Sequence, residues 1–552
     1  MNSKFIFFTC ALLFLLKTTG SCQAPFPTIE YVDINNIKAA QLVHGDMWWN
    51  PVQQVASCEF PKGSGKSISL ASSLWISGYD AGNQLHIAAQ TYRQNGNDYW
   101  PGPLDSAGTI SYSASQTWAK IWKVSRTQID SFLALSTHTT ANTPAPILQW
   151  PAKGNPYATG NGGTALTITN DLAPFVDVDH DGIYNPLHGD FPAMKGDQTL
   201  WWLFNDNGPS HGETHGQPLK IEVHGMAYAY SRGAMADNMI FYEYNVINKS
   251  GTNYNDFRVG QFADMDLGFY GDDYVGFDST HRMGIIYNGD TVDGSGQTNA
   301  YGDMIPTAAL TMLTLPGDAS GSFVPAGSFI DYHNDFTSTG NPSSAPEYNN
   351  YLRAMWRDST HLKNDFTGHN NPSYAYGPSY PDCNYEFTGD PADTAKWSEC
   401  ACGNMPSDRR FVIASNDFTL AAGSSQKVAL ALITTNQMLD NGCSNTNFNT
   451  IKQYADSAWY IYQHPYPPAG VPNVQPSYSL HIYPNPAHDK LFIDNMPAGT
   501  AIIVYNMLGQ VMRVPISNGG KVEMDISVLP SGIYNIAYSK DDMRGNARFV
   551  KE

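Results

Sequence analysis

Residues 239–247 carry an alternating pattern of side chains, and the turn sequence Asn-Lys-Ser-Gly follows them. Residues 410–414 and 427–433 are rich in β-branched and aliphatic side chains, with a turn between them at 422–425. A period of two is typical of β-strands, because successive side chains point to opposite faces of a sheet. The pattern therefore predicts strands at all three places, the last two as a hairpin or as neighbouring strands of a β-sandwich.

Helical periodicity occurs in two stretches, residues 117–135 and residues 448–462, where apolar side chains recur on one helical face. Elsewhere, turn sequences separate short aromatic and β-branched runs, which is typical of sheet. We therefore expect a mainly β fold class, with one or more β-sandwich passenger regions and a few helices.

The first 22 residues have the features of a signal peptide. Lys4 precedes an apolar run at residues 5–16, and small residues follow at 18–21. The run is too short to span a bilayer, which takes about 20 apolar residues. Cys22 leaves open the alternative that the cleaved chain is a lipoprotein acylated at this cysteine. No later segment is apolar and long enough to cross a membrane, so we expect a protein that is not integral to the membrane.

Composition divides the rest of the chain into three parts. Residues 23–463 form an acidic, β-rich passenger region, with a possible break between two subdomains near 160–175. Residues 464–475 are a proline-rich linker, and residues 476–552 contain short alternating strands separated by turns. Such strands in so short a segment predict a small Ig-like β-sandwich.

The chain is strongly acidic, with 50 Asp and Glu against 31 Lys and Arg. The excess of acidic residues lies within the passenger region. Nucleic-acid binding needs a basic surface that contacts phosphates, so the charge excludes a nucleic-acid partner. Acidity alone indicates only a solvated surface, so any further inference depends on specific motifs.

Residues 177–185 form the sharpest local motif, Asp-Val-Asp-His-Asp-Gly-Ile-Tyr-Asn. Acidic residues at the first, third and fifth positions and glycine at the sixth match a calcium-binding loop. The twelfth position is His188 instead of glutamate, and Asp190 is near enough to replace it. The loop resembles those of thrombospondin-type repeats more than an EF-hand, because no amphipathic helices flank it. An Asx-turn without an ion is the alternative. The expected Ca²⁺ ligands are Asp177, Asp179, Asp181, the Ile183 carbonyl and Asp190.

A second group of acidic residues lies at 264–278. So many carboxylates in a short segment repel each other unless they are solvated, protonated or bound to a metal. We therefore expect a second cation there, with a glycosidase-like pair of active-site carboxylates as the rival interpretation. The candidate ligands are Asp264, Asp266, Asp272, Asp273 and Asp278.

Four of the cysteines beyond the signal peptide lie close together in the sequence, at Cys383, Cys400, Cys402 and Cys443. In an exported protein we expect disulfides among them, in pairings that the sequence does not decide. Cys58 is the most distant cysteine and is expected to stay unpaired. A zinc site is a weaker interpretation, because Cys400-Ala-Cys402 lacks the two-residue gap of zinc-binding motifs.

Two further motifs are weak as functional sites. His211 and His215 have the spacing of a zinc-binding pair, but they lie in a segment rich in Gly and Pro, so a solvated loop is preferred. The adjacent tryptophans at 48–49 and 201–202 would suit sugar binding if they were exposed, but aromatic pairs in β-proteins usually lie in the core.

Residues 476–552 resemble the type A sorting domain of type IX secretion in Bacteroidetes. The resemblance covers the whole segment, and its motif residues are Tyr483, Pro484, Asn485, Pro486, Gly509, Gln510, Gly532, Tyr534 and Lys551. It implies that the type IX secretion machinery recognises the domain and carries the protein across the outer membrane. In that family the domain is removed and the cargo is often linked to surface lipopolysaccharide. The resemblance therefore implies a secreted or outer cell-surface location.

The passenger region resembles a family of large, uncharacterised Bacteroidetes surface proteins that carry this sorting domain. The resembling stretches include residues 35–39, 74–78, 100–103, 189–192 and 406–410. This resemblance extends over nearly the full chain and bears on fold and location, not on mechanism.

Three functions stay open for the passenger region. The favoured hypothesis is a calcium-stabilised, non-enzymatic adhesive or structural module. A secreted polysaccharide hydrolase is the first alternative, and it requires a cleft lined by two convergent carboxylates with raised pKa. A carbohydrate-binding module is the second, and it requires an exposed strip of tryptophan or tyrosine side chains.

Overall fold

The computed structural model describes residues 28–92, 96–208, 210–318, 323–364, 368, 381–435, 442–443, 448–466, 481–496, 498, 500–506, 511–513, 519–540 and 543–552. The expected signal peptide at 1–22 and most of the expected linker lie outside these residues. Two residues of the sorting motif, Gly509 and Gln510, also lie outside them.

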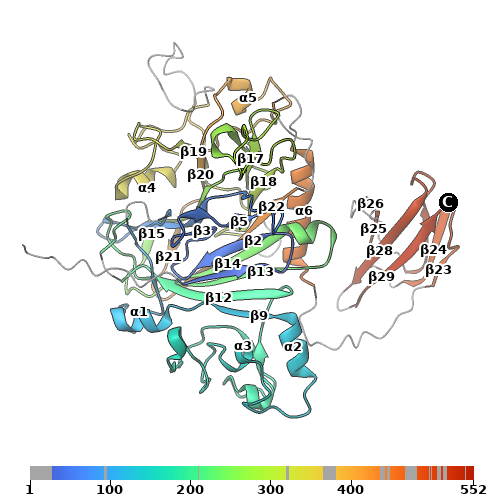
Figure 1. Cartoon of the computed structure of the whole chain (residues 1–552), viewed down its shortest axis with the longest axis horizontal. Helices are drawn as coiled ribbons and strands as arrows, with labels where there is room; N and C mark the ends of the chain where they lie inside the picture. Colours follow the sequence, from blue (N-terminus) through green and yellow to red (C-terminus); the bar gives the residue numbers. More distant parts are fainter. Residues whose placement is uncertain are drawn as a thin grey trace, which may run out of the picture.

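A nine-stranded antiparallel sheet forms the centre of the passenger region (Figure 1). Its order is β16-β17-β18-β22-β14-β13-β12-β8, and β9 pairs with β12 beside this path. The strands are β8 (Trp100–Pro101), β9 (Trp122–Ser125), β12 (Gln198–Asn205), β13 (Ile221–Ala229), β14 (Met239–Asn248), β16 (Asp273–Asp278), β17 (Met283–Asn288), β18 (Ala308–Thr314) and β22 (Ser425–Thr434).

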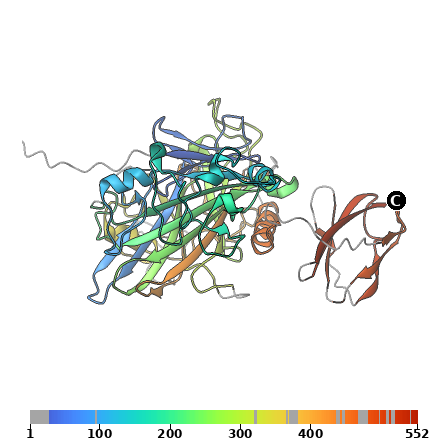
Figure 2. The same cartoon turned by 90° about the horizontal axis from the view of Figure 1, so that it is seen from below.

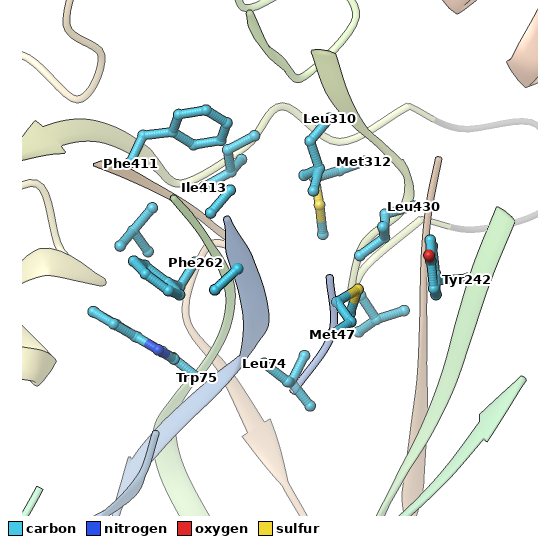
Figure 3. Close-up of a cluster of buried hydrophobic side chains, with 14 of the residues drawn as sticks. Met47, Leu74, Trp75, Tyr242, Phe262, Leu310, Met312, Phe411, Ile413 and Leu430 are labelled. Atoms are coloured by element: carbon cyan, nitrogen blue, oxygen red, sulfur yellow. The ribbon is translucent and has the colours of Figure 1, made fainter. Parts of the chain in front are cut away.

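A six-stranded sheet lies against it, in the order β19-β20-β15-β6-β7 with β21 paired to β15. Its strands are β6 (Ala71–Tyr79), β7 (Leu85–Ala88), β15 (Tyr254–Asp264), β19 (Ser328–His333), β20 (Arg409–Ala414) and β21 (Phe418–Leu420). The two sheets face each other across the largest hydrophobic core, which makes the passenger a β-sandwich (Figure 3). The side chains that meet between the two sheets include Leu74, Phe411 and Ile413 of the six-stranded sheet and Tyr242, Leu310, Met312 and Leu430 of the nine-stranded sheet. Trp75 and Phe262 belong to the same cluster but lie on the other face of the six-stranded sheet, where Trp75 contacts Tyr348 of the segment 345–351.

The nine-stranded sheet is buried on both faces. In β22, Leu430 and Leu432 belong to the core between the sheets, whereas Ala431 and Ile433 belong to a second core on the opposite face. Three helices contribute to that second core: α2 (Arg126–Leu133), α3 (Ala145–Leu148) and α6 (Asn449–Gln463). A strand buried on both faces is apolar at successive positions, which explains the continuous apolar run in the sequence of β22.

Short elements complete the passenger region. Its small sheets are formed by β1 (Ile29–Val32), β2 (Lys38–Leu42) and β5 (Cys58–Glu59), by β3 (Trp49–Asn50) and β4 (Val55–Ala56), and by β10 (Phe175–Val176) and β11 (Phe191–Pro192). Its remaining α-helices in the described residues are α1 (Tyr112–Trp118), α4 (Ala345–Tyr351) and α5 (Glu399–Cys402).

The two predicted helices have different outcomes. Residues 448–462 are helical, as α6. A single helix over 117–135 is wrong, because α1 ends there, β9 follows and pairs with β12, and only then does α2 begin. Ser125 starts α2 with a capping box: its side chain accepts a hydrogen bond from the Gln128 N–H, and the Gln128 side chain accepts one from the Ser125 N–H.

The strands expected at 239–247, 410–414 and 427–433 are confirmed as β14, β20 and β22. The last two do not form a hairpin, because β20 pairs with β15 and β19 whereas β22 pairs with β14 and β18 in the other sheet. A subdomain break near 160–175 is also wrong. Strands from before that point lie in both large sheets, β6 beside β15 and β9 beside β12.

The C-terminal residues form a separate small unit, drawn in red in Figure 1 and Figure 2. One sheet has the order β23-β24-β27 and the other β26-β25-β28-β29, and they share a core of their own. The mainly β fold class is therefore confirmed for both parts of the chain. The strands are β23 (His481–Tyr483), β24 (Lys490–Met496), β25 (Ala501–Asn506), β26 (Val511–Arg513), β27 (Gly520–Asp525), β28 (Gly532–Lys540) and β29 (Met543–Lys551).

Among the described residues, no helix is both long and apolar enough to cross a membrane.

Candidate cation sites, cleft and sorting motif

The acidic loop at 177–190 connects β10 to β11. These strands pair Phe175 with Pro192 and Val176 with Phe191, which brings the two ends of the loop together. Asp190 therefore lies beside Asp177 although the two residues are distant along the loop. One carboxylate oxygen from each of Asp177, Asp179 and Asp190 lies within 4.8 Å of the others.

Backbone groups hold two of these carboxylates in place. Asp190 is fully buried, and its Oδ1 and Oδ2 accept hydrogen bonds from the N–H groups of Val178 and Asn185, both at 2.8 Å. Asp177 Oδ2 accepts one from the Gly182 N–H at 2.8 Å. Asp177 Oδ1 is buried and has no hydrogen-bond partner among the described residues. An oxygen left in this way is a candidate ligand for a cation.

The third acid of the predicted motif, Asp181, lies outside the group of three carboxylates. Asp181 is exposed, and its Oδ1 accepts a hydrogen bond from the Ile183 N–H at 2.7 Å. His188, at the position where a calcium loop has glutamate, places its Nδ1 2.9 Å from Asp179 Oδ2. The structure therefore brings together two of the three alternating acids and the expected substitute, Asp190.

The electrostatics of the loop differ between its two ends. Burial raises the pKa of Asp190, and the neighbouring charges of Asp179 and Asp177 raise it further. Burial also acts to raise the pKa of Asp177, but hydrogen bonds from the Gly182, His180 and Asp181 backbone outweigh burial and lower it. A cation between these carboxylates would relieve the repulsion that raises the pKa of Asp190.

The five carboxylates of the second acidic segment lie in different surroundings. A single cation site made of all five is therefore wrong. Asp273 Oδ2 accepts a hydrogen bond from the Leu267 N–H at 3.0 Å, and Asp272 Oδ2 accepts one from the Gly294 N–H at 2.7 Å. Asp278 lies beside His281, 2.8 Å away, and Lys452 of α6, 3.7 Å away.

Asp264 and Asp266 instead meet Asp408, again with one oxygen of each within 4.8 Å of the others. Asp264 ends β15, and it pairs across the sheet with Arg410 near the start of β20, which places Asp408 beside it. Burial raises the pKa of Asp264 and of Asp266. Sequence reasoning missed Asp408, because only the pairing of two strands distant in sequence brings it into the group.

A cleft of about 550 Å³ lies next to this group, and Asp408 is among its lining residues. Asp331 of β19 and Glu386 also line the cleft, and each is only 3% exposed. Burial raises the pKa of both carboxyl groups well above the usual range. Arg409 lies 3.9 Å from Asp331 but 2.7 Å from Glu399. Its guanidinium therefore forms its closer ion pair with Glu399. No local motif predicts this pair, because Asp331 and Glu386 come from separate segments of the chain.

The tryptophan pairs and the cysteines are largely structural. Trp48, Trp201 and Trp202 are buried in the cores and present no surface for sugar stacking.

Cys400 of α5 and Cys443 form a disulfide, whereas Cys383 and Cys402 are half-buried. Cys58 is buried, and burial raises the pKa of its thiol far above the usual range.

Residues from both ends of the sorting motif meet in the C-terminal domain. Asn485 donates a hydrogen bond through its Nδ2 to the Arg548 carbonyl at 3.1 Å, and its Oδ1 accepts one from the Val550 N–H at 2.9 Å. Tyr483 donates a hydrogen bond to Asp494 at 3.1 Å. Tyr534 donates one to the Pro530 carbonyl at 2.7 Å and stacks on Phe549. The segment Tyr483–Pro486 therefore binds the last strand, β29, through the side chain of Asn485.

Residues 481–552 match the family model described as "Secretion system C-terminal sorting domain". The C-terminal unit is thus a sorting domain, and the chain is cargo of type IX secretion. The protein is accordingly secreted or located at the outer cell surface, and its sorting domain interacts with the type IX secretion machinery.

Two solved structures show weak similarity to the chain. A polysaccharide lyase shares 7% identity at a TM-score of 0.18; the match covers 60% of this chain and 34% of the lyase. PorZ, described as an essential surface component of the type IX secretion system of Porphyromonas gingivalis, shares 10% identity at a TM-score of 0.13. That match covers 95% of this chain and 75% of PorZ. Superpositions this poor carry no information on activity. No curated protein matches the chain.

Proposed function

We propose that the passenger region is a calcium-stabilised, non-enzymatic adhesive or structural module of the cell surface. The observation that carries the calcium proposal is the convergence of Asp177, Asp179 and Asp190 within 4.8 Å. Carboxylates this close repel each other unless a cation or a proton lies between them. Calcium binds hard oxygen ligands, and extracellular modules use sites with Kd on the order of 10⁻⁴ to 10⁻³ M.

Location and architecture support the structural or adhesive role. The sorting domain delivers the chain outward, and the passenger is a two-sheet sandwich with Trp48, Trp201 and Trp202 in its cores. The loop site is made of oxygen ligands near the surface, which suits an ion that stabilises a fold. We further propose that the exported passenger is released from the sorting domain and linked to surface lipopolysaccharide, as the resemblance implies.

Chelation tests the calcium proposal on the full-length protein. Calcium at a hundredfold excess over Kd should stabilise the fold by about 2.7 kcal/mol, and EDTA should remove that stabilisation. We expect Asp179→Asn to lower the melting temperature in calcium and to reduce the shift that EDTA causes. Asp181→Asn is the matched control, since it removes the same charge from the same loop but from a carboxylate outside the group. Equal EDTA shifts in the two variants would refute a calcium ion at this loop.

A polysaccharide hydrolase is the second candidate function, and the cleft beside β19 favours it. Asp331 and Glu386 are buried carboxyl groups with raised pKa, and both line one cleft. A group that holds its proton near neutral pH can act as a general acid, with a second carboxylate as base or nucleophile. The release of reducing ends from polysaccharides, lost in Glu386→Gln but kept in Asp335→Asn at the same cleft, would establish this activity.

A further inference from the structure

We propose that Asp264, Asp266 and Asp408 form a second, buried site for a hard divalent cation, which fastens β15 to β20. This inference does not rest on the calcium loop, because the two sites share no residue and lie in different parts of the fold. It also differs from the site that the acidic segment 264–278 suggests, since Asp408 takes part and Asp272, Asp273 and Asp278 do not.

The hydrogen bonding of the three carboxylates points to a missing positive partner. Asp264 is fully buried, and the three residues each present one oxygen within 4.8 Å of the others. The Oδ1 atoms of all three are buried, and none has a hydrogen-bond partner in the described part of the chain. Buried polar atoms are almost always paired, so an unpaired buried oxygen on each of three carboxylates that meet at one place points to a bound cation.

Arg410 supplies part of the positive charge but leaves these oxygens open. Its Nε donates to Asp264 Oδ2 at 2.8 Å, and its Nη2 donates to Asp408 Oδ2 at 3.2 Å. The guanidinium thus occupies the Oδ2 side of both carboxylates. When a bound ion keeps all three carboxylates ionised, they and one guanidinium leave two negative charges, which a divalent ion neutralises. A monovalent ion would leave one charge buried without a partner.

The ligand atoms define the kind of ion. All three donors are carboxylate oxygens, and the group contains no histidine or cysteine. Oxygen-only sites select Ca²⁺, Mg²⁺ or Mn²⁺ over zinc and copper, which prefer nitrogen and sulfur. Calcium is the ion we expect at the cell surface, because it tolerates an irregular set of ligands better than magnesium, which requires near-ideal octahedral geometry.

The position of the site gives it a structural role. Asp264 is the last residue of β15, and Asp408 immediately precedes β20, its partner in the six-stranded sheet. An ion there joins these strands at one end of their ladder. Asp408 also lines the cleft that holds Asp331 and Glu386, so the ion would fix one wall of that cleft.

Metal stoichiometry of the full-length protein tests the inference. After equilibration with Ca²⁺ and removal of free ions, mass spectrometry of the metal content should give two ions per wild-type chain. Asp408→Asn should lose one ion, Asp179→Asn the other, and the double variant both. Asp417→Asn, which changes an exposed carboxylate shortly after β20, is the matched control and should keep both.

The outcomes separate the two cation proposals. A single ion that is lost only in Asp179→Asn overturns this inference and leaves the calcium loop intact. A single ion that is lost only in Asp408→Asn supports this inference and overturns the calcium loop. If Asp408→Asn fails to fold, Asp266→Asn replaces it, because that variant leaves both Arg410 hydrogen bonds in place. Full retention of both ions in a folded Asp266→Asn or Asp408→Asn also overturns the site. Replacement of Ca²⁺ by Mg²⁺ in the same experiment, with equal occupancy, would overturn the assignment to calcium.

Discussion

At the scale of single residues, His211 is a buried histidine, contrary to the solvated loop expected for its segment. Its side chain is fully buried, with Nδ1 2.8 Å from the Ile87 carbonyl and Nε2 2.6 Å from the Asp206 carbonyl. A carbonyl oxygen only accepts hydrogen bonds, so both ring nitrogens must carry a proton. The imidazole is therefore a buried cation, with the carboxylates of Asp98 at 3.6 Å and Asp206 at 3.9 Å as counter-charges.

This charge makes the stability of the protein depend on pH. Burial alone lowers the pKa of His211, but Asp98 and Asp206 outweigh it and raise the pKa above the ordinary value. Burial raises the pKa of Asp206 as well, so we regard Asp98 as the main counter-charge. A raised histidine pKa contributes stability that is complete below about pH 6.5 and is lost as pH rises through the folded-state value.

We therefore expect the free energy of unfolding to fall between pH 6.5 and the raised pKa, by about 1.4 kcal/mol for each unit of the shift. Urea denaturation across this pH range measures the effect. His211→Gln should remove the dependence along with part of the stability, whereas His215→Asn, an exposed position in the same segment, should keep the dependence. An unchanged slope in His211→Gln would contradict the buried cation.

The ligands of the two acidic sites differ in how far the sequence predicts them. Asp177 and Asp179 follow from local spacing, and Asp190 was predicted because it lies near the end of the loop. Asp408 was missed, because only the pairing of β15 with β20 brings it to Asp264. Local spacing therefore predicts ligands within one loop, but it has no access to ligands that a sheet brings together.

At the scale of elements, the contrast between α6 and residues 117–135 has a physical cause. The helix α6 buries one face, including Ile451 and Ala458, and its period continues over its whole length. In residues 117–135 the same apolar period is interrupted by β9, where Trp122 and Val124 point into the core as alternate strand residues. The strand β9 has only four residues, and over so short a segment an alternating pattern of apolar side chains cannot be distinguished from a helical pattern. The capping box at Ser125 was the available signal for a new helix.

The disulfide between Cys400 and Cys443 joins α5 to the segment before α6, across 43 residues of sequence. By the chain-entropy model, a loop of this length stabilises the fold by about 4 kcal/mol as an upper value. We expect the double variant Cys400→Ser, Cys443→Ser to lose about 2 to 4 kcal/mol in guanidinium denaturation.

The wild-type protein under reducing conditions is the control and should unfold like the double variant. A wild-type protein whose unfolding midpoint does not respond to reductant would show that this bridge is not formed in the native protein.

At the scale of the whole molecule, strands from both halves of the passenger interleave. The six-stranded sheet places β6, from near the N-terminus, between β7 and β15, and it adds β19 and β20 from much later in the chain. The alternating pattern of the sequence predicts strands and hence a mainly β class. It does not contain the order of strands, because any two amphipathic strands satisfy the same pattern. A subdomain boundary placed by composition near 160–175 therefore failed.

The C-terminal domain differs, because its core is its own. The buried residues of that core run from Ala487 to Phe549, whereas among the described residues the buried members of the two passenger cores end at Ile461, with Tyr462 packed against one of them. The passenger can thus keep its packing without the sorting domain. Removal of residues 476–552 should therefore remove the sorting signal and leave the passenger fold intact.

We therefore expect the truncated chain to accumulate in the periplasm, because it lacks the domain that the type IX secretion machinery recognises. Cell fractionation and surface protease accessibility measure its location, and circular dichroism with thermal melting confirms that the periplasmic protein is folded. As a control for the domain itself, Asn485→Ala removes two side-chain hydrogen bonds to the backbone of β29 and should destabilise the domain by about 1 to 2 kcal/mol. It should reduce surface delivery less than the deletion does. A folded truncated chain that reaches the cell surface at the wild-type level would refute the role of this domain as the address.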